Sequence, residues 1–127
     1  MKKFLMIFVS IFILTILVIG FYFGRFSYIS FEEIDIAIQQ HHFQQDIKSE
    51  KKHFDLNQQG FYKEIQYKDE PHYIYTYQTV NRPTLKDLVN PQYQYKKANV
   101  ETFVENRKNG HDITHMNKAK HEIHDHP

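Results

Sequence analysis

Histidines near the carboxyl end of this 127-residue chain are the side chains most suited to chemistry. Five of the nine fall in the last 17 residues, with acidic residues among them: His111, His115, His121, His124 and His126. In a helical segment His111 and His115 would share one face, and so would His121 and His124. Imidazole and carboxylate together suit Zn²⁺, Ni²⁺ or Cu²⁺. The pattern marks a candidate metal-chelating segment, although we favour a polar tail that merely happens to be rich in histidine.

Tyrosines provide the second candidate site. Tyr73, Tyr75 and Tyr77 alternate with Ile74 and Thr76, so they would lie on one face of a strand. If that face is exposed, it forms an aromatic binding surface. If it faces inward, the three rings are core and their hydroxyls reach its rim. We favour the core, because three tyrosines bury more area than the opposite face does.

Little in the sequence could carry catalysis. It has no G-x-S-x-G, S-x-x-K or H-E-x-x-H motif and no cysteine. With four glycines in total, two of them inside the hydrophobic run described below, a loop that cradles phosphates is not expected. We therefore predict a protein that is not an enzyme and that has no cofactor, unless a metal binds at the tail.

A hydrophobic run near the amino terminus must position everything that follows. The 21 residues from Phe4 to Gly24 carry no charge and would form about 31 Å of helix, close to the thickness of a bilayer core. Ser10 and Thr15 are its frankly polar residues, and each can bond to the preceding helical turn. The run is longer than the apolar part of a signal peptide and lacks an A-x-A-like site, so we favour an uncleaved anchor. Positions that represent this anchor are Phe4, Ile11, Ile16 and Gly24.

The charges that flank the run predict its orientation. Lys2 and Lys3 precede it, whereas Arg25 follows it and is itself followed by several acids. The positive-inside bias then places the amino terminus in the cytoplasm and the domain outside the cell membrane. Without these three flanking residues, 13 basic residues face 15 acids. A domain so balanced is a poor partner for nucleic acid, and we expect partners in the membrane or the envelope.

The periodicity after the anchor predicts an α+β domain. Ser30 and Glu33 have the spacing of a capping box, which predicts a short amphipathic helix over residues 31–42 after a bend; the alternative is that the membrane helix simply continues. The period then changes to two, and an antiparallel meander of three or four strands is expected. Its segments are 47–56, a candidate edge strand, then 61–68, 73–80 and a candidate fourth strand at 91–97.

The sequence also predicts the turns between these strands, a short final helix and the boundaries of the domain. Asp69-Glu70-Pro71 is the expected turn between the second and third strands, and Asn57-Gln58-Gln59-Gly60 the loop before the second. Residues 82–90 fit one helical turn or a packed loop. Asn99 is the expected N-cap of a short helix that contains Val100, Phe103 and Val104. The predicted organisation is an anchor over residues 1–25, a domain over 26–108 and a mobile tail or loosely docked helix over 109–127.

The order of these features resembles a family of small proteins from Gram-positive bacteria, domain of unknown function 3139. The resemblance covers roughly residues 1–80. It rests on the two lysines before one hydrophobic span, on Asp46-Ile47-Lys48-Ser49, and above all on Tyr67-Lys68-Asp69-Glu70-Pro71-His72-Tyr73-Ile74-Tyr75-Thr76-Tyr77. It implies a membrane-tethered extracytoplasmic α+β domain and implies no activity. A helix followed by a meander is also similar in architecture to cystatin-like and PepSY-like domains, an analogy that transfers no function.

Three functions from different classes remain open at this point. The first is a membrane-anchored, extracytoplasmic binding module for an envelope protein or peptide. The second is a surface metal chelator that acts through the histidine-rich tail. The third is an immunity or exclusion factor that uses the membrane helix itself to engage a partner in the membrane.

Overall fold

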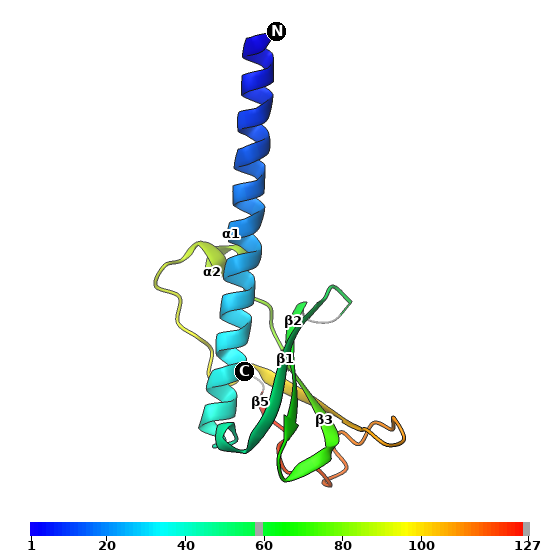
Figure 1. The fold of residues 1–127 in the computed structure, drawn as a ribbon. Helices are drawn as coiled ribbons and strands as arrows, with labels where there is room; N and C mark the ends of the chain where they lie inside the picture. The colour runs from blue at the N-terminus through cyan, green and yellow to red at the C-terminus, as the bar shows by residue number, and fades with distance from the viewer. Residues whose placement is uncertain (58–59, 126–127) are drawn as a thin grey trace.

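One long helix and an antiparallel sheet make up the fold. The structure is a computed structural model, and it describes residues 1–57 and 60–125. In Figure 1 the amino-terminal half of the helix projects away from the domain, and the sheet packs beside the other half. The elements are α1 (Lys2–Gln40), η1 (Gln44–Asp46), β1 (Ile47–Asp55), β2 (Gly60–Tyr67), β3 (Glu70–Thr79), α2 (Leu85–Val89), β4 (Val100–Asn106) and β5 (His124–Asp125).

Helix α1 runs for 39 residues without a break. The prediction of a bend followed by a separate helix is therefore wrong, and the alternative of one continuous helix is confirmed. Ser30, the predicted N-cap, lies inside the helix and is buried. No proline interrupts this region, and extending a helix costs less free energy than starting a new one. Ser10 and Thr15 bond to the carbonyl oxygens of Met6 and Ile11, as expected.

The two halves of α1 have different surroundings. Every residue before Arg25 is exposed, whereas buried positions begin at Phe26 and recur every three or four residues: Phe26, Ile29, Ser30, Glu33, Ile34, Ala37 and Ile38. That spacing gives the second half one buried face, which packs on the sheet. Among the described residues, α1 is the one helix that is long and apolar enough to cross a membrane.

The five strands are antiparallel neighbours in the order in which the chain forms them, β1-β2-β3-β4-β5. The first three predicted strands are confirmed, with β1 at the edge. The expected turn is shifted, because Glu70 and Pro71 already belong to β3. Gly60 has a φ of +95°, which fits the expected loop glycine, and a Cβ there would lie 2.6 Å from the ring of Phe26. Gln58 and Gln59 of that loop lie outside the described residues.

Two later predictions are wrong. The proposed fourth strand at 91–97 is irregular chain, and Tyr93 and Tyr95 pack instead beside Phe26 and Leu88. The proposed helix after Asn99 is strand β4, which pairs with β3 from Val100↔Thr79 onward. Its Val-Glu-Thr-Phe-Val sequence is rich in β-branched and aromatic residues, and the free edge of β3 supplies the partner that stabilises a strand. The predicted turn at 82–90 is confirmed as α2.

The histidine-rich segment packs against the domain. Ile113 and Ile123 are buried in the main core cluster, and β5 pairs with β4. Left-handed backbone at His115 and Asn117, with φ of 64° and 58°, is incompatible with a helix through these residues. The expectation of a mobile tail or a loosely docked helix therefore differs from the structure up to Asp125. Two isoleucines are sufficient to hold the segment against the domain, because each packs into a core that is already apolar.

A buried lysine connects the sheet to α1. The Lys63 side chain is 3% exposed, and its Nζ contacts Asp35 at 2.5 Å and also Glu50. Burial by itself lowers the pKa of Lys63, but the hydrogen bonds to Asp35 and Glu50 outweigh it, so its pKa lies above the ordinary value. The amine therefore stays charged and links α1, β1 and β2.

Candidate functional site

His121 lies at the centre of a buried group of polar side chains. The C-terminal segment carries it to the end of the sheet beside the last turn of α1, where its side chain is 4% exposed. Its ring stacks on Tyr67, with centroids 3.8 Å apart and planes 8° apart. Phe43 meets it edge-on at 4.6 Å. These aromatic contacts fix the orientation of the imidazole.

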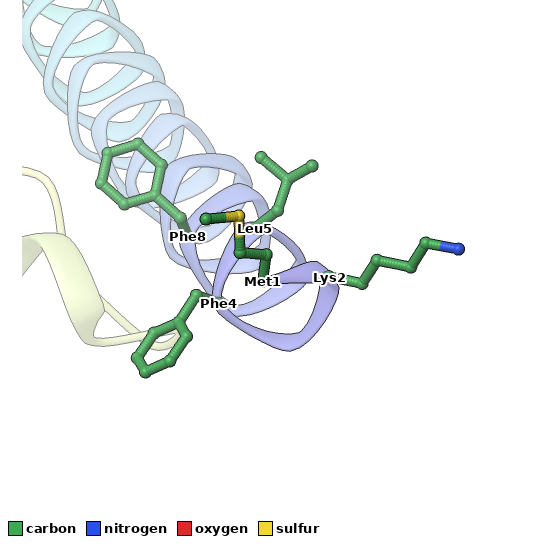
Figure 2. Close-up of a pocket in the computed structure, with 5 residues that line it drawn as sticks. All are labelled: Met1, Lys2, Phe4, Leu5 and Phe8. Carbon is green, nitrogen blue, oxygen red and sulfur yellow. The ribbon is translucent and has the colours of Figure 1, made fainter.

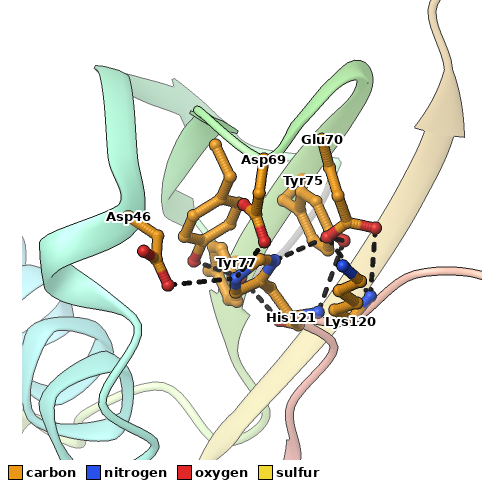
Figure 3. A network of polar contacts seen from close by, with 8 residues as sticks. Asp46, Asp69, Glu70, Tyr75, Tyr77, Lys120 and His121 are labelled. Carbon is orange, nitrogen blue, oxygen red and sulfur yellow. Dashed lines mark hydrogen bonds and ion pairs between the residues drawn. The ribbon is translucent and has the colours of Figure 1, made fainter.

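Glu70 holds one nitrogen of that imidazole. Its Oε1 lies 2.6 Å from His121 Nδ1 and 2.6 Å from the hydroxyl of Tyr75, which donates to it. The backbone N–H of Lys120 points at both carboxylate oxygens, at 3.3 and 3.2 Å. Figure 3 shows these groups converging on Glu70 from β3 and from the C-terminal segment. A buried carboxylate with this many donors is satisfied, and it orients the ring.

The other nitrogen of His121 faces two more carboxylates. Its Nε2 lies 3.7 Å from Asp46 Oδ2 in η1 and 3.7 Å from Asp69 Oδ2 in the β2–β3 turn. Both aspartates are more than one third exposed, so solvent reaches this side of the ring. Figure 3 shows the contacts of Asp46 and Asp69 meeting at this nitrogen of the imidazole. One imidazole nitrogen and two carboxylate oxygens form a set of ligands that could hold a divalent ion.

A chain of tyrosine hydroxyls runs beneath this group. Tyr77 donates to the carbonyl oxygen of His121 at 2.7 Å, so its oxygen accepts from Tyr67 at 2.6 Å. Tyr67, Tyr75 and Tyr77 are fully buried. Burial raises the pKa of each above the ordinary value of 10.0, and Glu70 adds to the increase at Tyr75. Tyr75 and Tyr77 are therefore core residues and not part of an exposed aromatic surface, while Tyr73 is partly buried against that core.

A second group of candidate ligands lies farther along the segment. The side chains of His115, Glu122 and His124 bring one ligand atom each to within 4.8 Å of the others. The rings of His115 and His124 stack at 4.0 Å, and Glu122 Oε1 lies 3.1 Å from His124 Nε2. Glu122 also accepts from the backbone N–H of His115 at 2.9 Å. The left-handed backbone at His115 makes this approach possible.

The predicted histidines are thus divided between two groups. His121 is in the first group, and His115 and His124 are in the second, so neither predicted helical pair, His111 with His115 or His121 with His124, shares a group. His111 is exposed and belongs to neither. His126 lies outside the described residues.

The sequence reasoning missed the carboxylates of the site. The expected turn at Asp69-Glu70-Pro71 gives no sign that Glu70 begins the strand that carries Tyr75 and has its side chain buried. Glu33 was missed in the same way: it is buried and accepts from Tyr93, Lys96 and Asn99. Its position four residues after Ile29 and four before Ala37, both apolar, was the signal that this glutamate faces inward.

The end of the domain nearest the apolar half of α1 carries exposed aliphatic side chains. Leu56, at the tip of the β1–β2 hairpin, is 71% exposed, and Leu85 and Val89 of α2 are 68% and 59% exposed. Arg25 fixes α2 beside α1, because its guanidinium donates to the carbonyl oxygens of Leu88 and Asn90. We call Leu56, Leu85 and Val89 the membrane-proximal rim. Figure 1 shows the hairpin and α2 on different sides of α1 at a similar level.

The first two turns of α1 expose large apolar side chains to their surroundings. Figure 2 shows Met1, Phe4, Leu5 and Phe8 standing out from the helix, with Lys2 extended beyond them. The hollow that these five residues line lies between side chains of one helix, and the lining includes no residue from any other element. It is therefore a gap between the side chains of a single apolar helix.

Fold and site together define a small α+β domain that is built onto the end of a long apolar helix. The model of the family described as "protein of unknown function (DUF3139)" matches residues 1–77 of the 127, and the chain belongs to this family. No curated protein and no solved structure matches the chain. The matched region contains Asp46, Asp69, Glu70 and the buried tyrosines, whereas His121 comes from the part that follows it.

The buried tyrosines predict instability in alkali. Above pH 10 the unfolded chain loses tyrosine protons that the folded chain retains, so the free energy of unfolding falls as pH rises. Each such group contributes a slope of about 1.4 kcal/mol per pH unit, and three contribute about 4. Urea unfolding in detergent between pH 8 and 11, followed by far-ultraviolet circular dichroism, measures this slope.

Single substitutions test whether the buried tyrosines cause this fall in the free energy of unfolding. Tyr77→Phe is expected to reduce the slope by about 1.4 kcal/mol per pH unit, since one such group is removed. Tyr62→Phe is the matched control, because Tyr62 is only partly buried and lies outside the hydroxyl chain. Equal slopes in the two variants would contradict the assignment.

Proposed function

We propose that the chain is a single-pass membrane protein whose domain is held against the outer face of the cell membrane of a Gram-positive bacterium. There it binds another envelope protein or peptide and performs no chemistry. The observation that carries this proposal is the continuity of α1. Its apolar half leads into its packed half without a linker, so a membrane-spanning helix would fix both the distance and the orientation of the domain.

The flanking charges support an outside location. Lys2 and Lys3 lie at the free end of α1, and beyond the apolar half Arg25 is the first charged residue. Arg25 donates to two backbone carbonyl groups of the α2 region and is held by the fold. The two unrestrained lysines therefore favour the cytoplasmic side.

The membrane-proximal rim supports a domain that rests on the bilayer. Leu56, Leu85 and Val89 come from two elements that flank α1 just beyond its apolar half, and each is largely exposed in water. Exposed aliphatic side chains next to a membrane-spanning helix can enter the interfacial region of the bilayer, which removes their apolar surface from water. Aromatic Tyr22 and Phe23 lie on α1 at the position expected of an interfacial belt.

The open edge of β1 supports a role in binding. β1 pairs on one side with β2 and ends the sheet order, and residues 48–52 are exposed. A free strand edge offers backbone donors and acceptors in a row, to which an extended peptide segment can add as a further strand. Four of these five residues are charged, Lys48, Glu50, Lys51 and Lys52, which guards the edge against self-association.

A single introduced cysteine tests the location and the binding edge together. The natural chain has no cysteine, so Lys51→Cys provides the one thiol. We expect a membrane-impermeant maleimide to label Lys51→Cys on intact cells, and Lys3→Cys only after lysis. The same thiol carrying a photoactivatable cross-linker is expected to capture an envelope partner, whereas Met116→Cys, exposed on the C-terminal segment, is not. Labelling of Lys3→Cys alone on intact cells would reverse the orientation.

Tryptophan fluorescence tests contact with lipid. The chain has no tryptophan, so Leu56→Trp, Leu85→Trp and Val89→Trp each introduce one probe on the rim. In vesicles that contain lipids brominated near the glycerol backbone, we expect strong quenching and blue-shifted emission from all three. Met116→Trp is the control on the opposite end of the domain and should be unaffected. Equal emission from rim and control would show that the rim does not touch lipid.

A second candidate function is metal chelation by the histidine-rich segment. The observation that favours it is the convergence of His115, Glu122 and His124, whose ligand atoms lie within 4.8 Å of one another. Two imidazoles and one carboxylate suit Zn²⁺, Ni²⁺ or Cu²⁺. In this role the domain would hold the ion at the cell surface.

Calorimetric titration of the full chain with Ni²⁺ tests this function. The protein is purified in detergent without a polyhistidine tag. Replacing His115 and His124 with alanine is expected to remove one binding event, while His111→Ala, in neither group, leaves it unchanged. If the event survives the double replacement, the segment is not the chelator.

A further inference from the structure

We infer that Asp46, Asp69 and His121 form a binding site for one divalent transition-metal ion, with Zn²⁺ the ion that suits it best. This inference does not depend on either proposed function. It also differs from chelation by the histidine-rich segment, because two of the three ligands come from the body of the domain. Three separate parts of the chain meet here: η1, the β2–β3 turn and the C-terminal segment.

The distances around His121 Nε2 suit ligands that share one ion. Asp46 Oδ2 and Asp69 Oδ2 each lie 3.7 Å from it, and the three ligand atoms are all within 4.8 Å of one another. An N–H···O hydrogen bond spans about 2.7–3.2 Å, so neither aspartate is at bonding distance. Ligands about 2.0–2.2 Å from one ion lie about 3.3–3.6 Å apart in a tetrahedron. The two distances from the aspartates to His121 Nε2 therefore need to contract by only a few tenths of an ångström.

The negative charges around His121 also favour a bound cation. Three carboxylates, Asp46, Asp69 and Glu70, surround one imidazole. With the Nδ1 proton directed at Glu70, an uncharged ring would turn the lone pair of Nε2 toward two anions. A divalent ion satisfies both the charge and the spacing.

The imidazole is already held as a metal ligand requires. Glu70, 7% exposed, fixes Nδ1 at 2.6 Å, which is the carboxylate–histidine arrangement that supports bound metals. Tyr67 stacks against one face of the ring. Because the ring is oriented before any ion binds, little conformational freedom is lost on binding.

The donor set and its exposure decide the kind of ion. One nitrogen and two oxygens with room for water suit Zn²⁺ in three-ligand sites, whereas Ca²⁺ and Mg²⁺ favour all-oxygen ligands. The Asp46 and Asp69 side chains are 45% and 39% exposed, so an ion enters from solvent while His121 remains buried. A bound ion would fasten the C-terminal segment to η1 and to the β2–β3 turn.

Zn²⁺ titration of the full chain tests the site. The protein is purified in detergent without a polyhistidine tag and is stripped with a chelator. His115→Ala and His124→Ala are introduced together to remove the second group of ligands. We expect this variant to bind one Zn²⁺ and, with Co²⁺ as a probe, to show the visible absorption of a low-symmetry site. Adding Asp46→Asn or Asp69→Asn is expected to weaken binding at least about tenfold, because each removes an anionic ligand.

Controls separate loss of the ligand from loss of the fold. Asp46 and Asp69 make no side-chain hydrogen bond in the part of the chain that the structure describes, so both amide variants should keep the near-ultraviolet dichroism of the packed tyrosines. Glu105→Gln, a carboxylate on β4 outside both groups, should bind as the parent does. Unchanged affinity in both aspartate variants would overturn the site. So would a folded parent that binds neither Zn²⁺ nor Co²⁺.

Discussion

The continuity of α1 is the constraint on which the rest of the structure depends. One 39-residue helix is first an exposed apolar cylinder and then the helix against which the domain packs. The sheet lies on the face from Phe26 to Ile38, and Arg25 holds α2 where the two halves meet. A flexible joint at this point would leave both the hairpin tip and α2 without a defined relation to the apolar half. With a rigid helix, Leu56 and Leu85 have fixed positions beside it.

Aromatic residues with polar ends shape the core. Tyr67, Tyr75 and Tyr77 supply large apolar area, but each hydroxyl needs a partner when it is buried. Two groups from different parts of the chain meet that need: the carbonyl oxygen of His121 in the C-terminal segment accepts from Tyr77, and the buried Glu70 of β3 accepts from Tyr75. The same contacts place the imidazole of His121 between carboxylates. The tyrosines therefore complete their hydrogen bonds through the same contacts that assemble the polar site.

Local periodicity predicted those parts of the fold that depend on local signals. The apolar run, the first three strands and the turn of helix at α2 follow from patterns within a few residues. Val100 to Val104 fitted both a helix and a strand, and the free edge of β3 decided between them. Ser30 has the sequence pattern of a helix N-cap, but the helix that begins at Lys2 continues through it. Asp46, Asp69 and His121 are separated by up to 75 positions, and only the finished fold brings them together. Histidine content pointed to the segment but not to its partners.

The order of the strands has a consequence for how the protein matures. Because β1 to β5 are neighbours in order of synthesis, the sheet can grow by adding one strand at a time as the chain emerges. The core is nevertheless closed by residues 121–125, which are made only after β1 to β4. Until they arrive, the hydroxyls of Tyr77 and Thr102 lack the carbonyl oxygens of His121 and Ile123. A prematurely terminated chain would therefore expose an incomplete core, a feature by which quality-control proteases distinguish unfinished chains from mature ones.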